Sequence, residues 1–145
     1  QMRVFIENEA GSRIKNTFDE RTLARVGTAE VSRAYPYPYG FVLGTRSGDG
    51  DAVDCFVLTR TPLKSGTIAQ CLAVGLLEQV EDGETDHKVL ALLPGESVGL
   101  NGAVLAQLTD FVSGVFAHVP GKRMEIGRLL GREAAESFIR GCSVP

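Results

Sequence analysis

Three carboxylates lie within six residues of the chain, in the segment Asp49-Gly50-Asp51-Ala52-Val53-Asp54. An apolar run that begins at Cys55 follows directly, so a buried strand would hold the segment in place. Two carboxylates about 4 Å apart repel each other by roughly 4 kcal/mol at the effective dielectric near a protein surface. If the three acids share a pocket, they therefore require positive charge among them. A hard divalent cation such as Mg²⁺ or Ca²⁺ would supply it, and lysine or arginine neighbours would do so more weakly.

The same segment has a purely structural interpretation, which stays open at this point, because Asp and Gly also gather in turns for backbone reasons. An EF-hand fits less well. Its loop requires a bidentate Glu eleven residues after the first Asp, and this chain has Arg60 there.

A second acidic segment runs from Glu81 to Lys88 and also ends at the start of a strand pattern. Taken alone, it is typical of a solvated hairpin turn with scattered charge. If the two acidic loops lie at neighbouring rims of one sheet, however, their side chains would converge on a single site.

All three tyrosines of the chain occur in the segment Tyr35-Pro36-Tyr37-Pro38-Tyr39-Gly40. Prolines stiffen the backbone and would hold the phenol hydroxyls in fixed positions, where they can donate to an anion. The alternative is a rigid edge segment that packs its rings on the sheet.

The elements that must position these residues change in type along the chain. Short β patterns separated by Gly, Pro and Asp fill the first two-thirds, and we predict strands over Met2 to Glu7, Arg13 to Phe18, Tyr39 to Gly44, Val53 to Thr59, Thr67 to Val80 and Lys88 to Leu93. The longest should bend or carry a bulge near Gly75.

After Pro94 the apolar spacing becomes helical. We predict a helix from Asn101, as its cap, to His118, then a short extended piece near Arg123 to Ile126 and a second helix over Arg132 to Ile139. Strands followed by helices indicate a mainly β fold with some α. We expect a small β-barrel flanked by C-terminal helices that pack on one side of it.

Composition limits the class of protein. The 145 residues suffice for one domain with one core, which we predict over residues 1–145. A net charge of −3 argues against a general nucleic-acid binder, and no apolar stretch reaches the roughly 18 residues that cross a bilayer. The strand pattern begins at Met2, so we expect no targeting segment. Three cysteines without CxxC spacing favour a reduced, cytoplasmic protein over a disulfide-linked one.

Three motifs follow one another in the chain. They are Tyr-Pro-x-x-Tyr-Gly, then Asp-Gly-Asp-x-Val-Asp ten residues after the second Tyr, then Gly-Glu-Thr-Asp-x-Lys ahead of a strand. In order, spacing and context they resemble the soluble inorganic pyrophosphatases of family I. The likeness runs from about Val4 to Leu93 and, more weakly, through the helix that starts at Asn101. It implies a five-stranded OB-like barrel, hydrolysis of pyrophosphate with two or more Mg²⁺ ions, and a homo-oligomer, since bacterial relatives of this kind are usually hexamers.

The resemblance also implies roles for individual acids. The metal ligands would be Asp49, Asp54, Asp86 and Glu81. Among them Asp54 would bridge to a second ion, and Asp82 would replace Glu81 if the loop shifts by one residue. Asp51 would accept the proton of the attacking water.

Three further residues would hold phosphate oxygens by the same resemblance, namely Lys15, Tyr39 and Lys88. Glu7 matches an early glutamate on the outer side of the family's site, and Tyr35 matches the first tyrosine of the family's motif. Phosphoryl transfer asks a protein mainly for positioning and charge neutralisation, which this set would provide.

The chain departs from the family's pattern at four positions. Thr17 stands where a glutamate is expected, and Gly27 stands where a phosphate-binding arginine is expected, with Arg25 and Arg33 as its candidate replacements. Val115 and Phe116 replace a late Tyr-Lys pair.

Lys122 and Arg123 are the cations that could reach in from the segment after that lost pair. Each missing charged hydrogen bond costs roughly 1.5 to 3 kcal/mol of binding, a factor of ten or more. The departures therefore leave other functions open beside pyrophosphate hydrolysis. One is hydrolysis of another phosphoanhydride with a larger leaving group, and another is a non-catalytic module that binds metal or phosphate.

Overall fold

The computed structural model describes residues 1–122 and 124–144. In chain order its elements are β1 (Met2–Asn8), β2 (Ile14–Phe18), β3 (Arg25–Glu30), β4 (Tyr39–Val42), β5 (Asp54–Val57), β6 (Ile68–Glu81), β7 (Glu84–Thr85), β8 (Lys88–Leu92), α1 (Gly102–Gly114), β9 (Met124–Leu130) and α2 (Arg132–Cys142). Neither α1 nor α2 is long and apolar enough to cross a membrane.

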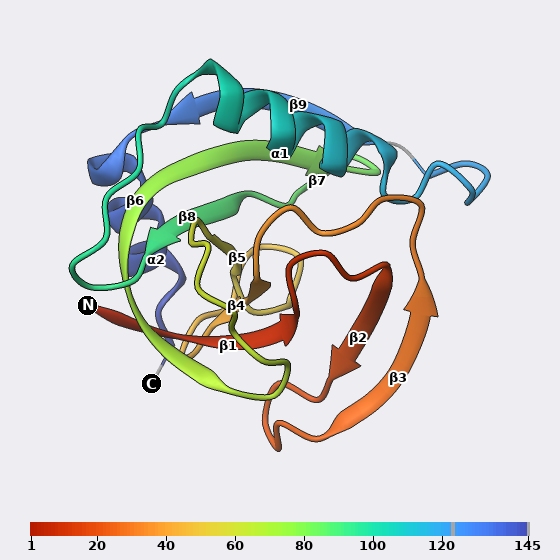
Figure 1. Cartoon of the computed structure of the whole chain (residues 1–145), viewed down its shortest axis with the longest axis horizontal. Coiled ribbons are helices and arrows are strands. Elements are labelled where there is room, and N and C mark those ends of the chain that lie inside the picture. Colours follow the sequence, from red (N-terminus) through yellow and green to blue (C-terminus); the bar gives the residue numbers. More distant parts are fainter. Residues whose placement is uncertain (123, 145) are drawn as a thin grey trace.

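Five strands close into a ring. β1 pairs with β4, β4 with β5, β5 with β8 and β8 with β6, and β6 returns to pair with β1. Within the ring the β5–β8 pair is parallel and the other pairs are antiparallel. The predicted OB-like five-stranded barrel is confirmed, and Figure 1 shows the β2–β3 hairpin beside it and α1 across its other flank.

The long strand β6 bends to serve several partners. Its register with β8 shifts between Ala73 and Gly75, which confirms the predicted bulge. A Cβ atom at Gly75 would lie 2.7 Å from Leu100 Cδ1 and 3.0 Å from the carbonyl oxygen of Leu130. Only glycine lets these segments approach so closely. Beyond the bend, β6 pairs with β9 and turns into β7.

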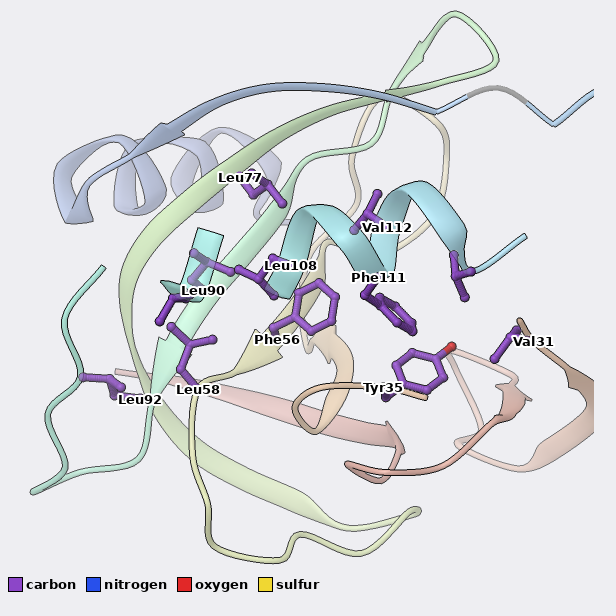
Figure 2. Close-up of a cluster of buried hydrophobic side chains, with 12 residues drawn as sticks. Val31, Tyr35, Phe56, Leu58, Leu77, Leu90, Leu92, Leu108, Phe111 and Val112 are labelled. Carbon is purple, nitrogen blue, oxygen red and sulfur yellow. The ribbon is translucent and has the colours of Figure 1, made fainter. Parts of the chain in front are cut away.

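Each face of the barrel wall has its own apolar cluster. One cluster takes residues from all five strands of the ring and fills the interior of the barrel. Ala135 of α2 packs against this cluster. On the outside, α1 packs Leu108 and Phe111 against Phe56 of β5, as Figure 2 shows. The β2–β3 hairpin contributes Phe18 to a third cluster, on the outer side of β1 and β4. The cavity described below lies outside the barrel, where α1 and the hairpin approach each other.

Several details of the predicted elements are wrong. The two helices do not pack on one side, because α1 covers the outer wall while α2 packs against the interior cluster. The first helix ends at Gly114 and not at His118. The carbonyl of Val115 accepts from the backbone N–H of Ser32, so it is not used to continue the helix. The predicted cap is confirmed, since the Asn101 side chain accepts from the first-turn N–H groups of Ala103 and Val104.

Two strands differ from expectation for reasons of exposure. β3 was not predicted, because all six of its residues are exposed and show no apolar period. The extended piece predicted near Arg123 to Ile126 belongs to a longer strand, β9. The alternation of buried and exposed side chains along β9 is interrupted where its register with β6 shifts, between Leu77 and Gln79 of β6. Arg123 itself lies outside the described residues. That residues 1–145 form one domain stays a prediction, which a single cooperative calorimetric transition would support.

Candidate active site

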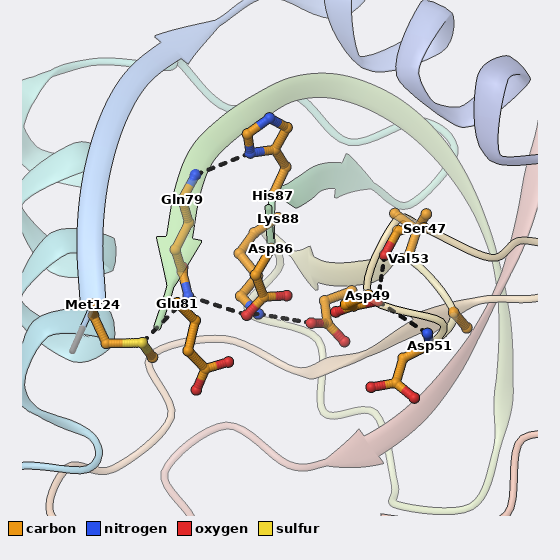
Figure 3. Close-up of polar contacts among 12 residues, drawn as sticks. Ser47, Asp49, Asp51, Val53, Gln79, Glu81, Asp86, His87, Lys88 and Met124 are labelled. Carbon is orange, nitrogen blue, oxygen red and sulfur yellow. Dashed lines mark hydrogen bonds and ion pairs between the residues drawn. The ribbon is translucent and has the colours of Figure 1, made fainter. Parts of the chain in front are cut away.

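A cavity of about 530 Å³ opens between the β2–β3 hairpin, the acidic loops and α1. Its lining includes the eight residues to which the sequence analysis gave the leading site roles, namely Lys15, Tyr39, Asp49, Asp51, Asp54, Glu81, Asp86 and Lys88. Glu7, Thr17 and Tyr35 line it as well. Segments far apart in the chain thus meet around one space, and Figure 3 shows acids from both loops grouped around a common region.

Polar contacts within the loop between β4 and β5 stabilise its conformation. Asp49 Oδ1 accepts from the backbone N–H of Asp51 at 2.9 Å and from Ser47 Oγ at 2.6 Å (Figure 3). Gly50 has a φ of 89°, which favours glycine. The turn interpretation of this segment is therefore correct for Asp49, yet the same turn directs the loop's acids into the cavity lining.

Lys88 joins the two acidic loops. Its Nζ donates to Asp54 Oδ2 at 2.7 Å and to Asp86 Oδ2 at 3.0 Å, and its side chain is only 7% exposed. The parallel pairing of β5 with β8 makes Asp54 and Lys88 direct register partners. These two carboxylates hold the Lys88 pKa above its ordinary value against the opposing effect of burial, so this lysine stays charged.

Burial, and secondly the neighbouring carboxylates, raise the pKa values of several acids in the cavity. Burial, with the nearby charge of Asp54, raises the pKa of Glu7 to about 8. Burial also raises the pKa of Asp86 to about 7, although Lys88 acts against this shift. The pKa of Asp51 is raised by burial and then by Asp49 and Asp54. This negative charge is what a bound cation would relieve.

Two tyrosines, Tyr35 and Tyr39, line the cavity together with Lys88. The Tyr39 ring lies 5.6 Å from Lys88 Nζ and packs against Tyr35, with ring centroids 5.4 Å apart. Burial raises the pKa of both phenols, further by the charge of Asp54, so both hydroxyls remain protonated donors.

The wall contributed by α1 and its C-terminal turn is largely apolar. It consists of Phe111, Val112, Val115, Phe116 and, from β9, Met124. This wall supplies no hydroxyl or ammonium group of its own toward the space.

Comparison with known proteins assigns the chain to a protein family. The family model described as inorganic pyrophosphatase matches residues 4–143. The chain belongs to the inorganic pyrophosphatase family. It is 31% identical to the inorganic pyrophosphatase of Geobacillus stearothermophilus over 152 residues, covering 97% of this chain and 91% of the relative. It is 26% identical to that of Nanoarchaeum equitans over 97% of this chain and 94% of the relative.

Solved structures agree with this assignment. An inorganic phosphatase from Anaplasma phagocytophilum superposes with a TM-score of 0.88 at 30% identity, over 97% of this chain and 90% of that one. The inorganic pyrophosphatase of Helicobacter pylori has a TM-score of 0.88 at 25% identity, over 97% and 89% of the two chains. Enzymes of this family hydrolyse pyrophosphate and are generally metal-dependent.

As the side chains stand, the described part of this pyrophosphatase-family chain contains no group of three His, Cys, Asp or Glu placed to hold a metal ion. The ammonium of Lys88 occupies the space between Asp54 and Asp86. Next to it, Gln79 donates to Asp86 Oδ2 at 3.3 Å, while the buried Gln79 Oε1 has no donor among the described residues. The side chains that could coordinate a metal here all offer hard oxygen atoms, and one buried oxygen, Gln79 Oε1, has no hydrogen-bond partner within residues 1–122 and 124–144. This set of ligand atoms therefore fits a divalent cation.

The sequence analysis missed several residues that line the cavity and proposed others that do not. Glu20 accepts from the backbone N–H of Ala52 in the acidic loop at 3.1 Å, and nothing in its local sequence signals this contact. The arginines in the lining are Arg21 and Arg46. Neither Arg25 nor Arg33, the candidates to replace an arginine at position 27, lines the cavity.

Proposed function

We propose that this chain hydrolyses inorganic pyrophosphate to two phosphates and uses Mg²⁺ to do so. The observation that carries the proposal is the shared cavity, in which acids from two loops, buried lysine and tyrosine meet. The family assignment supports the same reaction.

The metal ligands that we propose are Asp49, Asp54, Asp86 and Glu81. Glu81 is favoured over its neighbour Asp82 because Glu81 lines the cavity, whereas Asp82 lies in the β6–β7 turn with a φ of 51°. When bound, a pair of Mg²⁺ ions would activate a water molecule and stabilise the charge of the leaving oxygen.

Asp51 is the proposed general base. Its pKa is raised by burial and by Asp49 and Asp54, which moves it toward the operating pH, where a general base is most effective. In the reaction the water oxygen forms a bond to one phosphorus and its proton passes to Asp51. The bond from that phosphorus to the bridging oxygen breaks, and the other phosphate leaves with that oxygen.

Lys15, Tyr39 and Lys88 are the proposed ligands of the phosphate oxygens. Both Tyr39 and Lys88 have raised pKa values, so each keeps a proton to donate. They sit on strands of the closed barrel and therefore hold their donors in fixed directions, which is the positioning that phosphoryl transfer requires.

A second candidate function is hydrolysis of a phosphoanhydride that carries an organic group. The apolar wall of Val115, Phe116 and Met124 favours it, because an organic leaving group would contact this wall better than a phosphate would. A panel of nucleoside diphosphates and other organic diphosphates, tested with Mg²⁺ beside pyrophosphate, separates the two candidates.

Phosphate release from pyrophosphate tests the leading proposal. We expect release with Mg²⁺ and at least a hundredfold loss in Asp51→Asn, the order of magnitude of general base catalysis. Asp110→Asn is the matched control, because Asp110 pairs with Arg33 and is 72% exposed. If wild-type protein releases no more phosphate than a no-enzyme blank, the proposal is wrong.

We also propose a cytoplasmic location and a homo-oligomer, a hexamer by resemblance. All three cysteines are free thiols, which supports a reducing compartment. Sedimentation velocity of the purified protein tests the assembly, and a monomer at micromolar concentration would contradict it.

A further inference from the structure

Two lysine side chains from distant segments meet on one aromatic ring at the α1 wall of the cavity. Lys15 Nζ of β2 lies 5.0 Å from the centroid of the Phe116 ring, and Lys122 Nζ lies 4.7 Å from it. Both distances are within the range of cation–π attraction. Phe116, which supplies no donor itself, thus holds two ammonium groups beside the cavity that it lines.

A carboxylate fixes one of these ammonium groups. Lys122 Nζ lies 2.7 Å from Glu81 Oε1, and the Lys122 side chain is 30% exposed. An ammonium group has three donors, so the bond to Glu81 leaves others for a ligand. Glu81 in turn keeps its second oxygen, and its proposed metal contact is compatible with this bond.

The two cations are close enough to repel each other. Since both lie about 5 Å from one centroid, their charges are within about 10 Å, one Debye length in 0.1 M salt. Within residues 1–122 and 124–144, Lys15 forms no close ion pair, and the carboxylates of Glu7 and Asp51 attract it only from a longer distance. An anion bound close to both ammonium groups would offset the repulsion between them.

Lys122 lines a second cavity next to the main one. This second cavity has a volume of about 440 Å³ and shares Phe116 and Met124 with the first. Lys122 itself does not line the main cavity, but it contacts Glu81 and Phe116, and both of these residues do.

We propose that Lys122, positioned by Glu81 and Phe116, acts with Lys15 as a binding site for a phosphate group of the substrate. The identity of the ligand as part of a phosphoanhydride rests on the proposed function. The site gives the chain a cationic contact on a wall where Val115 and Phe116 themselves offer none.

Kinetics of Lys122 variants test this inference. We expect Lys122→Met to raise the KM for pyrophosphate about tenfold, the loss of one charge-assisted hydrogen bond, with a smaller change in kcat. Lys122→Arg should stay within about threefold of wild type, because the cation remains. Lys64→Met is the matched control, since Lys64 is an exposed lysine outside both cavities. A KM for Lys122→Met equal to that of Lys64→Met would overturn the inference and leave the proposed function standing.

Titration with inorganic phosphate in the presence of Mg²⁺ separates this inference from the proposed function. If wild type shows no turnover, the proposed function fails, yet a roughly tenfold weaker phosphate Kd in Lys122→Met still supports the binding site. Equal phosphate binding by the two proteins, or none by wild type, overturns it. If Lys122→Met does not fold, Phe116→Leu decides by the same titration. Loss of the cation–π contact should weaken phosphate about threefold, and an unchanged Kd would count against the site.

Discussion

Thr17 and Gly27 are direct cross-strand partners in the β2–β3 hairpin. Opposed residues of an antiparallel pair project to the same face, so Gly27 lies toward the side on which Thr17 lines the cavity. The resemblance leads one to expect a glutamate at position 17 and an arginine at position 27. The chain therefore lacks both expected charges at the same cross-strand position of the hairpin.

Restoring the arginine should therefore strengthen substrate binding. A Cβ at Gly27 would meet no atom of the described residues within 4 Å, so the hairpin accepts a side chain there. We expect Gly27→Arg to lower the KM for pyrophosphate, by up to about tenfold if one charged hydrogen bond forms. Thr17→Glu alone should raise the KM, because it adds negative charge, and the double variant should recover part of this loss. Steady-state kinetics of the three variants measure the effect, and a Gly27→Arg protein with wild-type KM would contradict it.

Lys88 should stabilise the metal-free protein strongly. Its removal leaves Asp54 and Asp86 without their shared cation in a largely buried place. Breaking a buried ion pair in this way costs about 3 to 5 kcal/mol, so we expect Lys88→Met to lower the unfolding free energy by about 3 kcal/mol at pH 8 in EDTA. Urea denaturation followed by circular dichroism measures it, with Lys64→Met as the exposed control. Equal losses in the two variants would show that the ion pair contributes little.

Glu7 should make the metal-free protein less stable as the pH rises. Its pKa is about 8 in the folded chain against an ordinary 4.5, so the folded state holds a proton that the unfolded state releases between these values. The resulting stability is complete below pH 4.5 and is lost as the pH rises through about 8, at up to about 1.4 kcal/mol per pH unit. Thermal unfolding in EDTA from pH 5 to 8 measures this slope. Glu7→Gln should flatten it while the exposed Glu9→Gln should not, and identical slopes in the two variants would refute the prediction.

We expect Glu20 to stabilise the conformation in which the acidic loop between β4 and β5 binds metal. Its two carboxylate oxygens lie 3.1 and 3.2 Å from the backbone nitrogen of Ala52. Because the group is partly exposed, we expect Glu20→Ala to raise the Mg²⁺ concentration for half-maximal activity by about threefold to tenfold. Faster hydrogen exchange at the Ala52 amide should accompany this change. Glu96→Ala, which removes an exposed contact to Thr61, is the control, and an unchanged Mg²⁺ requirement would exclude the role.

Burial explains which elements were predictable. Strands such as β5 and β8 have continuous apolar runs because both of their faces are covered, and the sequence analysis found them. The fully exposed β3 has no such run, and β2 is its only strand partner within the part of the chain that the structure describes.

The sequence motifs likewise predicted residues that share the cavity. They could do so because Asp49 to Asp54 and Asp86 to Lys88 lie in short segments whose spacing indicates a common site. Glu20, Arg46 and the contact of Lys122 with Glu81 arise only from tertiary packing. No local spacing records that packing, so the sequence analysis missed Glu20 and Arg46 and named Lys122 without its contact to Glu81.

The parallel pairing of β5 with β8 also has a consequence for how the site comes into being. Asp54 and Lys88 are 34 residues apart, and the whole of β6 intervenes. No local hairpin can bring them together, and contacts of long sequence separation form late because loop closure must come first. During synthesis the acidic loop therefore emerges without its lysine, and catalytic competence should appear only with the closed barrel, never in a partly folded chain.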